Sequence, residues 1–146
     1  MDEIDVKILN HLKANSRATA SEISKQINLS IPAVAERIRK MEVAGTIEKF
    51  TIKVNRAQQG YHLLAFIMVT LDKTENIHPF REAICRNENV LECHHLAGPA
   101  DYMLKVLVRN TLELEDFIMN KLKKMEGVES SSTFISLCPL KEEINI

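Results

Sequence analysis

Residues 29–47 of the chain read LSIPAVAERIRKMEVAGTI. Three apolar residues in this stretch recur at the spacing of one helix face: Val34, Ile38 and Met41. Ser30 is a candidate N-cap, and Pro32 falls in the first turn, where a missing N–H has no cost. Gly45 follows where a left-handed residue commonly ends a helix. The stretch therefore predicts a helix from about Ser30 to Gly45.

Two shorter amphipathic segments precede this helix. Apolar residues recur at helical spacing through residues 2–13, and acidic residues occupy the first turn, where the helix dipole favours negative charge. Thr19 and Glu22 have the spacing of a capping box, which predicts a second helix ending near Ile27. Helix, short helix, turn and helix in this order is the helix-turn-helix arrangement.

The outer face of the third predicted helix is polar and basic. In a helix-turn-helix protein this helix enters the major groove of DNA, and we expect Arg37 to contact guanine there. Other candidate DNA-binding residues are Ser30, Lys25, Lys40 and Lys49 on phosphates, Ala33 on the same outer face, and Arg39 on its flank. The pattern alone also fits a three-helix bundle whose basic side chains extend into solvent.

Charge and composition narrow the class of protein. Residues 1–60 contain ten Lys and Arg against seven Asp and Glu, whereas residues 61–146 contain nine against thirteen. A basic half joined to an acidic half suggests a module that binds polyanions, joined to a second module with a different role. No apolar run is long enough to span a membrane, no signal peptide is visible, and three cysteines form no C-x-x-C pair. We therefore expect a cytoplasmic protein with reduced thiols.

The remaining periodicities divide the chain. Residues 47–54 predict a half-buried strand, with Phe50, Ile52 and Val54 on one face and Lys49, Thr51 and Lys53 on the other, which completes a helix-turn-helix domain over 1–54. Residues 55–61 are expected to be a linker. Residues 62–146 predict strand, helix, strand, strand, helix and strand, which is the βαββαβ ferredoxin-like order of an α+β protein. Such a sheet leaves one face bare, and a second copy of the chain is the simplest cover.

Two motifs resemble those of the Lrp/AsnC family, the leucine-responsive or feast/famine transcription regulators. One is the 29–47 stretch, preceded by Asp5-x-x-Ile8-Leu9, and the other is Gly98-x-x-Asp101-Tyr102. The resemblance covers essentially the whole chain. It implies a winged helix-turn-helix followed by an effector-sensing domain, in homodimers that assemble into tetramers or octamers. The implied partners are double-stranded DNA and a small effector, commonly an amino acid.

The resemblance also indicates an effector site. It places the effector at the turn formed by Gly98, Pro99, Ala100 and Asp101, with further residues nearby: Thr111, Phe134, Ile135 and Ser136. Asp101 has the charge to pair with the ammonium group of an amino acid, although a carboxylate in a turn often bonds its own backbone. His94 is expected to line this pocket or a subunit interface, where it would titrate near neutral pH.

Other chemistries have weaker support. Cys93-His94-His95 offers two ligands at most on one strand face, fewer than zinc requires, so we expect no metal. No phosphate-binding glycine loop and no catalytic pattern is visible, which predicts neither a cofactor nor an enzyme. Two alternatives remain: an architectural DNA-binding protein without an obligatory ligand, and an enzyme resembling sirohaem decarboxylases that would use His94 and His95.

Overall fold

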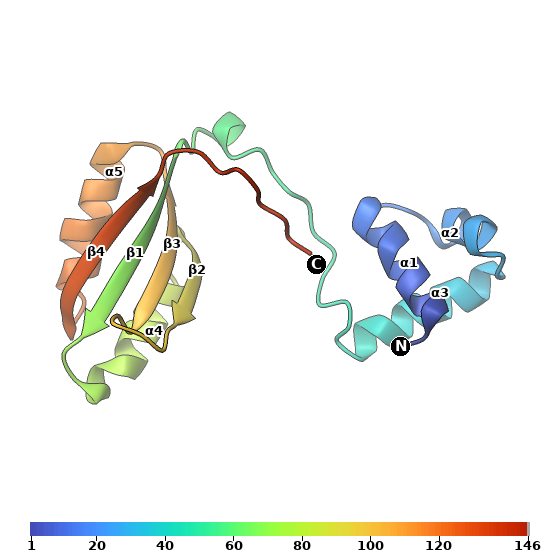
Figure 1. The fold of residues 1–146 in the computed structure, drawn as a ribbon, viewed down its shortest axis with the longest axis horizontal. Helices are drawn as coiled ribbons and strands as arrows, with labels where there is room; N and C mark the ends of the chain where they lie inside the picture. The colour runs from blue at the N-terminus through green and yellow to red at the C-terminus, as the bar shows by residue number, and fades with distance from the viewer. Residues whose placement is uncertain (146) are drawn as a thin grey trace. The chain divides into compact units, whose positions relative to one another are not determined.

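The computed structural model describes residues 1–145, which form two compact units. One unit contains Met1–Val54 together with the described tail after Glu142, and the other contains Asn55–Glu142. Figure 1 shows the helices of the first unit and the sheet with its helices in the second. We describe each unit by itself.

The N-terminal unit consists of three helices: α1 (Glu3–Ala14), α2 (Ala20–Ile27) and α3 (Ile31–Val43). Each begins where its cap predicts, because the side chains of Asp2, Thr19 and Ser30 accept a hydrogen bond from the first turn. The turn between α2 and α3 contains Asn28 in the left-handed conformation, with φ of 57°. The core is made of five buried apolar side chains: Ile8, Leu12, Ile23, Val34 and Met41. The predicted helix-turn-helix is confirmed.

The strand predicted over residues 47–54 is wrong for the single chain. These residues form no sheet ladder, and the side chains of Phe50, Ile52 and Val54 are 47%, 75% and 54% exposed. The alternating pattern gives the segment a strand-like preference, but a strand also needs a neighbour to accept and donate its backbone hydrogen bonds. No neighbouring strand lies beside it among the described residues.

The second unit is a four-stranded antiparallel sheet with two helices. Its strands, in the spatial order β2-β3-β1-β4, are β1 (Leu63–Leu71), β2 (Val90–His95), β3 (Tyr102–Val108) and β4 (Val128–Ser136). Helix α4 (Ile77–Cys85) follows β1. Helix α5 (Thr111–Asp116) follows β3 and continues through a π-helical turn, Phe117–Lys121, and a 3-10 turn, Leu122–Lys124. Short 3-10 turns also occur at Ala57–Gln59 and Thr74–Asn76. The predicted βαββαβ fold is confirmed.

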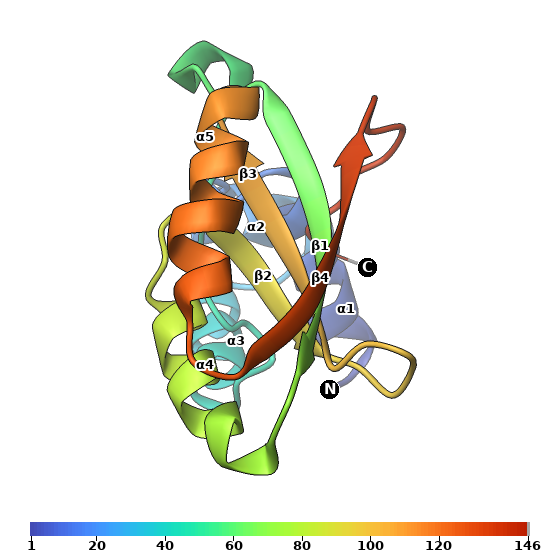
Figure 2. The same cartoon turned by 90° about the vertical axis from the view of Figure 1, so that its left-hand side faces the viewer.

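Both helices of this unit pack on the same face of the sheet (Figure 2). The core between them is formed by twelve buried residues: Ala65, Ile67, Val69, Phe80, Ile84, Tyr102, Leu104, Val106, Val108, Leu114, Phe117 and Leu122. Gly127, with φ of +84°, lies in the turn between the second helical segment and β4 and packs against Asn76, leaving no space for a Cβ atom. This contact fixes the start of β4 beside the loop that precedes α4.

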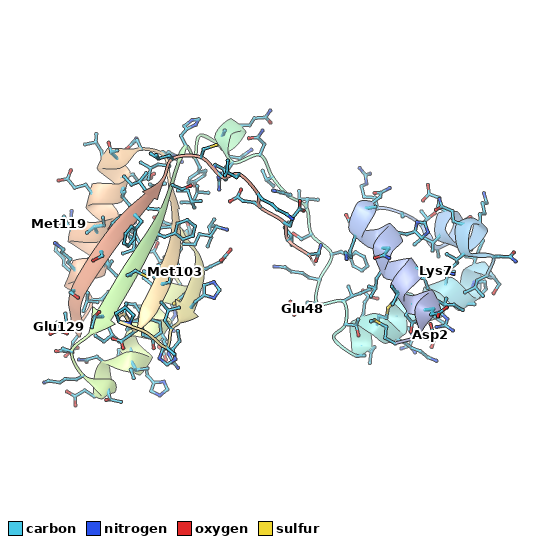
Figure 3. All side chains as sticks on the ribbon, in the orientation of Figure 1. Asp2, Lys7, Glu48, Met103, Met119 and Glu129 are labelled. Atoms are coloured by element: carbon cyan, nitrogen blue, oxygen red, sulfur yellow. The ribbon has the colours of Figure 1, made fainter. Side chains whose placement is uncertain are left out.

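The opposite face of the sheet carries no helix of this unit. The strand register places Phe66, Met68 and Met103 there, because their neighbours in sequence lie in the helix-covered core, and Phe134 shares their face because it lies opposite Phe66. Met103 projects from β3 in Figure 3, and the side chain of Phe134 is 58% exposed. A band of apolar side chains is therefore left without cover. None of the described helices has the length and apolarity to cross a membrane.

Candidate DNA-binding and effector sites

Helix α3 is held by its inner face and presents its outer face to solvent. Val34 and Met41 are buried against α1 and α2. The Ser30 hydroxyl oxygen accepts from the Ala33 N–H at 3.3 Å, so it caps the helix while its own proton stays available to a phosphate. Lys40 is exposed in the last turn, and Lys25 and Lys49 are exposed on α2 and on the segment after α3.

Arg37 does not extend freely from this face as expected. Its NH1 donates to Asp2 Oδ2 at 2.8 Å and to Asp5 Oδ1 at 2.7 Å, so it ties α3 to the start of α1. Figure 3 labels Asp2 at that start. The physical reason is that α1 begins beside α3 with a capping box of two carboxylates, which attract the nearest cation. A base-reading role for Arg37 stays a prediction.

The two carboxylates are strong acceptors in this position. Backbone hydrogen bonds from Asp5 to Asp2 and from Asp2 to Asp5 lower the pKa of both groups, and the hydrogen bonds from Arg37 lower it further. A groove of about 460 Å³ runs past this cluster, and Ala33, Glu36 and Lys40 line it as well. The acidic first turn that the sequence shows therefore has a second role besides complementing the helix dipole, because it also holds Arg37.

Arg39 is also paired. Its Nε and NH2 donate to the two carboxylate oxygens of Glu36, both at 2.8 Å, in a bidentate contact one turn along α3. Both side chains are largely exposed, 61% and 48%, so water and salt weaken this pair. The pair places the guanidinium on the flank of α3, as the helical spacing predicts.

Asp101 connects the predicted effector turn to the end of β1. Its Oδ2 accepts from the Leu71 N–H at 2.7 Å, and its own N–H donates to the Val69 carbonyl at 3.0 Å. The carboxylate therefore bonds a separate segment of the chain and not its own turn. The second carboxylate oxygen has no hydrogen bond among those resolved for the described residues.

A cavity of about 190 Å³ lies beside Asp101, on the side of the sheet that the helices cover. It is lined by Leu71, Asp72, Lys73, Thr74, Ile77, His95, Asp101 and Tyr102. Acidic and basic groups meet apolar side chains there, which suits a small zwitterion. Lys73 and Ile77 carry no sequence signal for this role, because only the fold brings the start of α4 to the end of β1.

The other predicted effector residues lie elsewhere in the chain. Phe134, Ile135 and Ser136 pair with the first half of β1, and Thr111 begins α5 after β3 has ended. Leu64, opposite Ser136, is separated from Val69, next to Asp101, by five residues or about 17 Å of strand. One subunit therefore does not bring these residues to the Gly98–Asp101 turn.

The two histidines of β2 lie on opposite faces, as the strand periodicity predicts. His95 stacks on Tyr102, with ring centroids 5.1 Å apart, and lines the cavity. His94 lies on the bare face with Nε2 3.1 Å from Glu92 Oε2. Within one subunit the pair cannot hold one porphyrin between them. Across residues 1–145, no group of three His, Cys, Asp or Glu side chains could hold a metal ion.

Two family models match this arrangement. The AsnC-type helix-turn-helix domain matches residues 1–42, and the Lrp/AsnC ligand binding domain matches residues 64–146. The chain belongs to the Lrp/AsnC family. Like its relatives in this family, it joins a helix-turn-helix unit to a ferredoxin-like unit.

Individual Lrp/AsnC relatives match along four fifths of the chain or more. LrpC of Bacillus subtilis is 34% identical over 81% of this chain and 81% of that protein. The leucine-responsive regulatory protein of Rhizobium meliloti is 29% identical over 100% of this chain and 95% of that protein. Among solved structures, AsnC of E. coli has a TM-score of 0.92 at 27% identity, covering 97% and 95%. A transcriptional regulator of Neisseria meningitidis in complex with L-Met has a TM-score of 0.95 at 25% identity, covering 100% and 96%.

Proposed function

We propose that this Lrp/AsnC protein is a sequence-specific DNA-binding transcription regulator of the cytoplasm whose binding is modulated by an amino acid. The observation that carries the proposal is the pairing of two separate units. One presents the outer face of α3, and the other presents a charged cavity beside the Asp101 turn. The related Neisseria regulator is a complex with L-Met, which supports an amino acid as the effector class.

The DNA-binding step places α3 in the major groove. Ser30, Lys40, Lys25 and Lys49 contact phosphates, and Ala33 lets the helix approach the bases closely. Arg37 reaches a guanine only after it exchanges Asp2 and Asp5 for the base. That exchange makes the affinity of Arg37 for a site depend on how well the base replaces two carboxylates.

The effector step uses opposite charges across the cavity. The free oxygen of Asp101 accepts from the ammonium group of the amino acid, and the ammonium group of Lys73, now 3.7 Å from Glu75, attracts its carboxylate. Ile77 and Tyr102 supply apolar surface to the side chain. Gly98, Pro99 and Ala100 shape the turn. Residues at the far end of the sheet, Thr111 and Phe134–Ser136, complete the site from a neighbouring subunit.

Assembly links the two steps. The bare apolar face of the sheet pairs with that of a second copy, and the dimers associate further into tetramers or octamers. An effector bound between subunits changes their packing, and the packing sets the spacing of the α3 helices on successive half-sites.

A thermal-shift screen of the twenty amino acids on the full protein tests the effector, since a bound ligand raises the melting temperature by mass action. A mobility-shift titration with and without the best binder then tests the coupling. We expect at least one amino acid to raise the melting temperature and to change DNA affinity. Absence of any shift across the screen would remove the amino-acid effector from the proposal.

One observation favours a second function. Because Arg37 and Arg39 are both paired with carboxylates, the exposed lysines are the more accessible cations, and they hold phosphates without reading bases. An architectural role that bends or wraps DNA would need no more than that. The ratio of affinities for a selected site and for random DNA, measured across salt, separates the two: a ratio near one favours the architectural protein.

A further inference from the structure

Helix α4 lies over β2 in a fixed register. The Arg81 Nε donates to the Tyr102 hydroxyl at 2.8 Å, and Arg81 NH2 lies 3.4 Å from His95 Nδ1. The guanidinium also lies over the Tyr102 ring, 5.6 Å from its centroid. These contacts fix which residues of the helix face which residues of the strand.

The same register brings two cysteines together. Cys85 is four residues after Arg81, about 6 Å along the helix, and Cys93 is two residues before His95, about 7 Å along the strand. The helix and the strand run in opposite directions and are joined by the short Arg86–Asn89 connection. Moving from Arg81 to Cys85 along the helix and from His95 to Cys93 along the strand therefore leads toward the same end of the helix–strand pair. The register therefore places the Cys85 and Cys93 side chains close to each other, at the point where α4 ends over β2.

The two thiols differ in environment. Cys85 is exposed at the end of α4, whereas Cys93 is half-buried and packs against the core of the sheet unit. Burial raises the pKa of the Cys93 thiol, and the neighbouring Cys85 thiol raises it further. An exposed thiol beside a second thiol meets two requirements of a peroxide-reactive cysteine, which are access to the oxidant and a resolving partner. The third cysteine, Cys138, is exposed in the segment after β4, and its Sγ contacts only the Pro139 carbonyl among the resolved hydrogen bonds.

We propose that Cys85 and Cys93 are a site of reversible oxidation that closes a disulfide between α4 and β2 in the presence of a hydroperoxide. The Cys85 thiolate attacks the O–O bond of hydrogen peroxide, which yields a sulfenic acid at Cys85 and hydroxide, protonated to water. The Cys93 sulfur then attacks the Cys85 sulfur and displaces a second water. Two thiols lose two electrons and two protons, and one peroxide becomes two waters. A small dithiol reductant reverses the reaction by thiol–disulfide exchange.

This site is independent of the proposed regulatory function, because it requires neither DNA nor an amino acid. It lies one helical turn from Arg81, whose partners His95 and Tyr102 line the cavity beside Asp101. The cross-link would hold the end of α4 on the strand at this point.

Peptide mapping of the full protein tests the proposal. The reduced protein is treated with hydrogen peroxide, free thiols are blocked with N-ethylmaleimide, and the monomer band of a non-reducing gel is digested with trypsin. We expect peptide 82–86 linked to peptide 87–105, two hydrogen atoms lighter than the two thiol peptides together, and loss of two of the three free thiols. Dithiothreitol should restore all three.

The variants give matched controls. Cys85→Ser and Cys93→Ser should each abolish the linked peptide, whereas Cys138→Ser should leave its yield unchanged. The proposal is wrong if residues 85 and 93 both carry N-ethylmaleimide after peroxide treatment while Cys138 is oxidised. It is also wrong if residues 85 and 93 are linked only in a dimer band, which would mean that the bond joins different chains.

Discussion

The guanidinium of Arg37 on α3 donates to the carboxylate of Asp5 on α1 at 2.7 Å. The same nitrogen reaches Asp2, so the side chain best positioned by sequence to read a base is held by two acids of its own unit. In the unbound protein this cluster stabilises the helix arrangement. If Arg37 contacts guanine as proposed, this cluster competes with the base for the same donor.

Releasing Arg37 should increase its availability to DNA. We expect Asp5→Asn to lower the melting temperature of the protein, since α1 loses part of its capping box, and to increase affinity for DNA. Glu36→Gln is the matched control, because it frees the flanking Arg39. A mobility-shift titration checks both variants. Equal gains in the two would show that added positive charge, and not the Arg37 contact, raises the affinity.

Removing Arg37 should reduce specificity more than general affinity. We expect Arg37→Ala to weaken binding to a selected site by about 10- to 100-fold, the value of one bidentate base contact, while random DNA changes less. Lys40→Ala is expected to weaken both DNAs alike and to lower the salt dependence by about one phosphate contact. Competitive titrations at several salt concentrations check this. If Arg37→Ala behaves like Lys40→Ala, Arg37 contacts no base.

Asp101→Asn should separate the structural and ligand-binding roles of this side chain. The amide oxygen can still accept from the Leu71 N–H, but the group carries no charge for an ammonium ion. We therefore expect the fold and DNA binding to persist and the calorimetric signal of an amino-acid effector to disappear. Asp101→Ala also removes the hydrogen bond and should cost about 1–2 kcal/mol of stability. A full effector signal in Asp101→Asn would refute the cavity beside Asp101 as the site.

The stability of the N-terminal unit should fall in acid. The hydrogen bonds at Asp2 and Asp5 hold the pKa of both groups below their ordinary value of 3.8, so the charged forms are favoured in the folded state. This stabilisation is fully present above pH 3.8 and is lost as the pH falls through the lower folded values. Thermal melts of the full protein between neutral pH and pH 2 check it. We expect the double variant Asp2→Asn, Asp5→Asn to lose less stability than the native protein over the acid range.

A charge on the bare sheet face should prevent dimer formation. Phe134 is 58% exposed in the single chain and pairs with Phe66 across β1 and β4, so Phe134→Glu would bury a carboxylate in the proposed interface. We expect a monomer in sedimentation velocity. Leu112→Glu, an equally apolar and 75% exposed position on α5, should leave the dimer intact. A Phe134→Glu dimer as tight as the native one would place the interface elsewhere.

Local patterns predicted most of the fold because local chemistry determines it. The caps at Thr19 and Ser30 lie where the sequence places them, since each accepts from an N–H three residues ahead. The prediction of a strand over residues 47–54 was wrong because a strand depends on more than local chemistry. The alternation of these residues is a local property, but a ladder depends on a second strand that is absent from the described part of the chain.

The site was harder to predict because it depends on contacts between distant segments. Arg37 has the helical position of an outward residue, and only the packing of α1 reveals its two partners. Asp101 and Lys73 are far apart in sequence and meet at one cavity because β1 ends beside the β2–β3 turn. His95 lines that cavity in place of His94, a difference of one residue that strand register decides.

The distance along β1 between Ser136 and Asp101 has a consequence for how a cell would use this protein. If a complete effector site needs both ends of the sheet, two chains must meet before either senses the metabolite well. Responsiveness then rises with the protein's own abundance, so that a sparse pool stays insensitive and an abundant pool reacts steeply. Expression level would set the threshold of the sensor, without any change in its sequence.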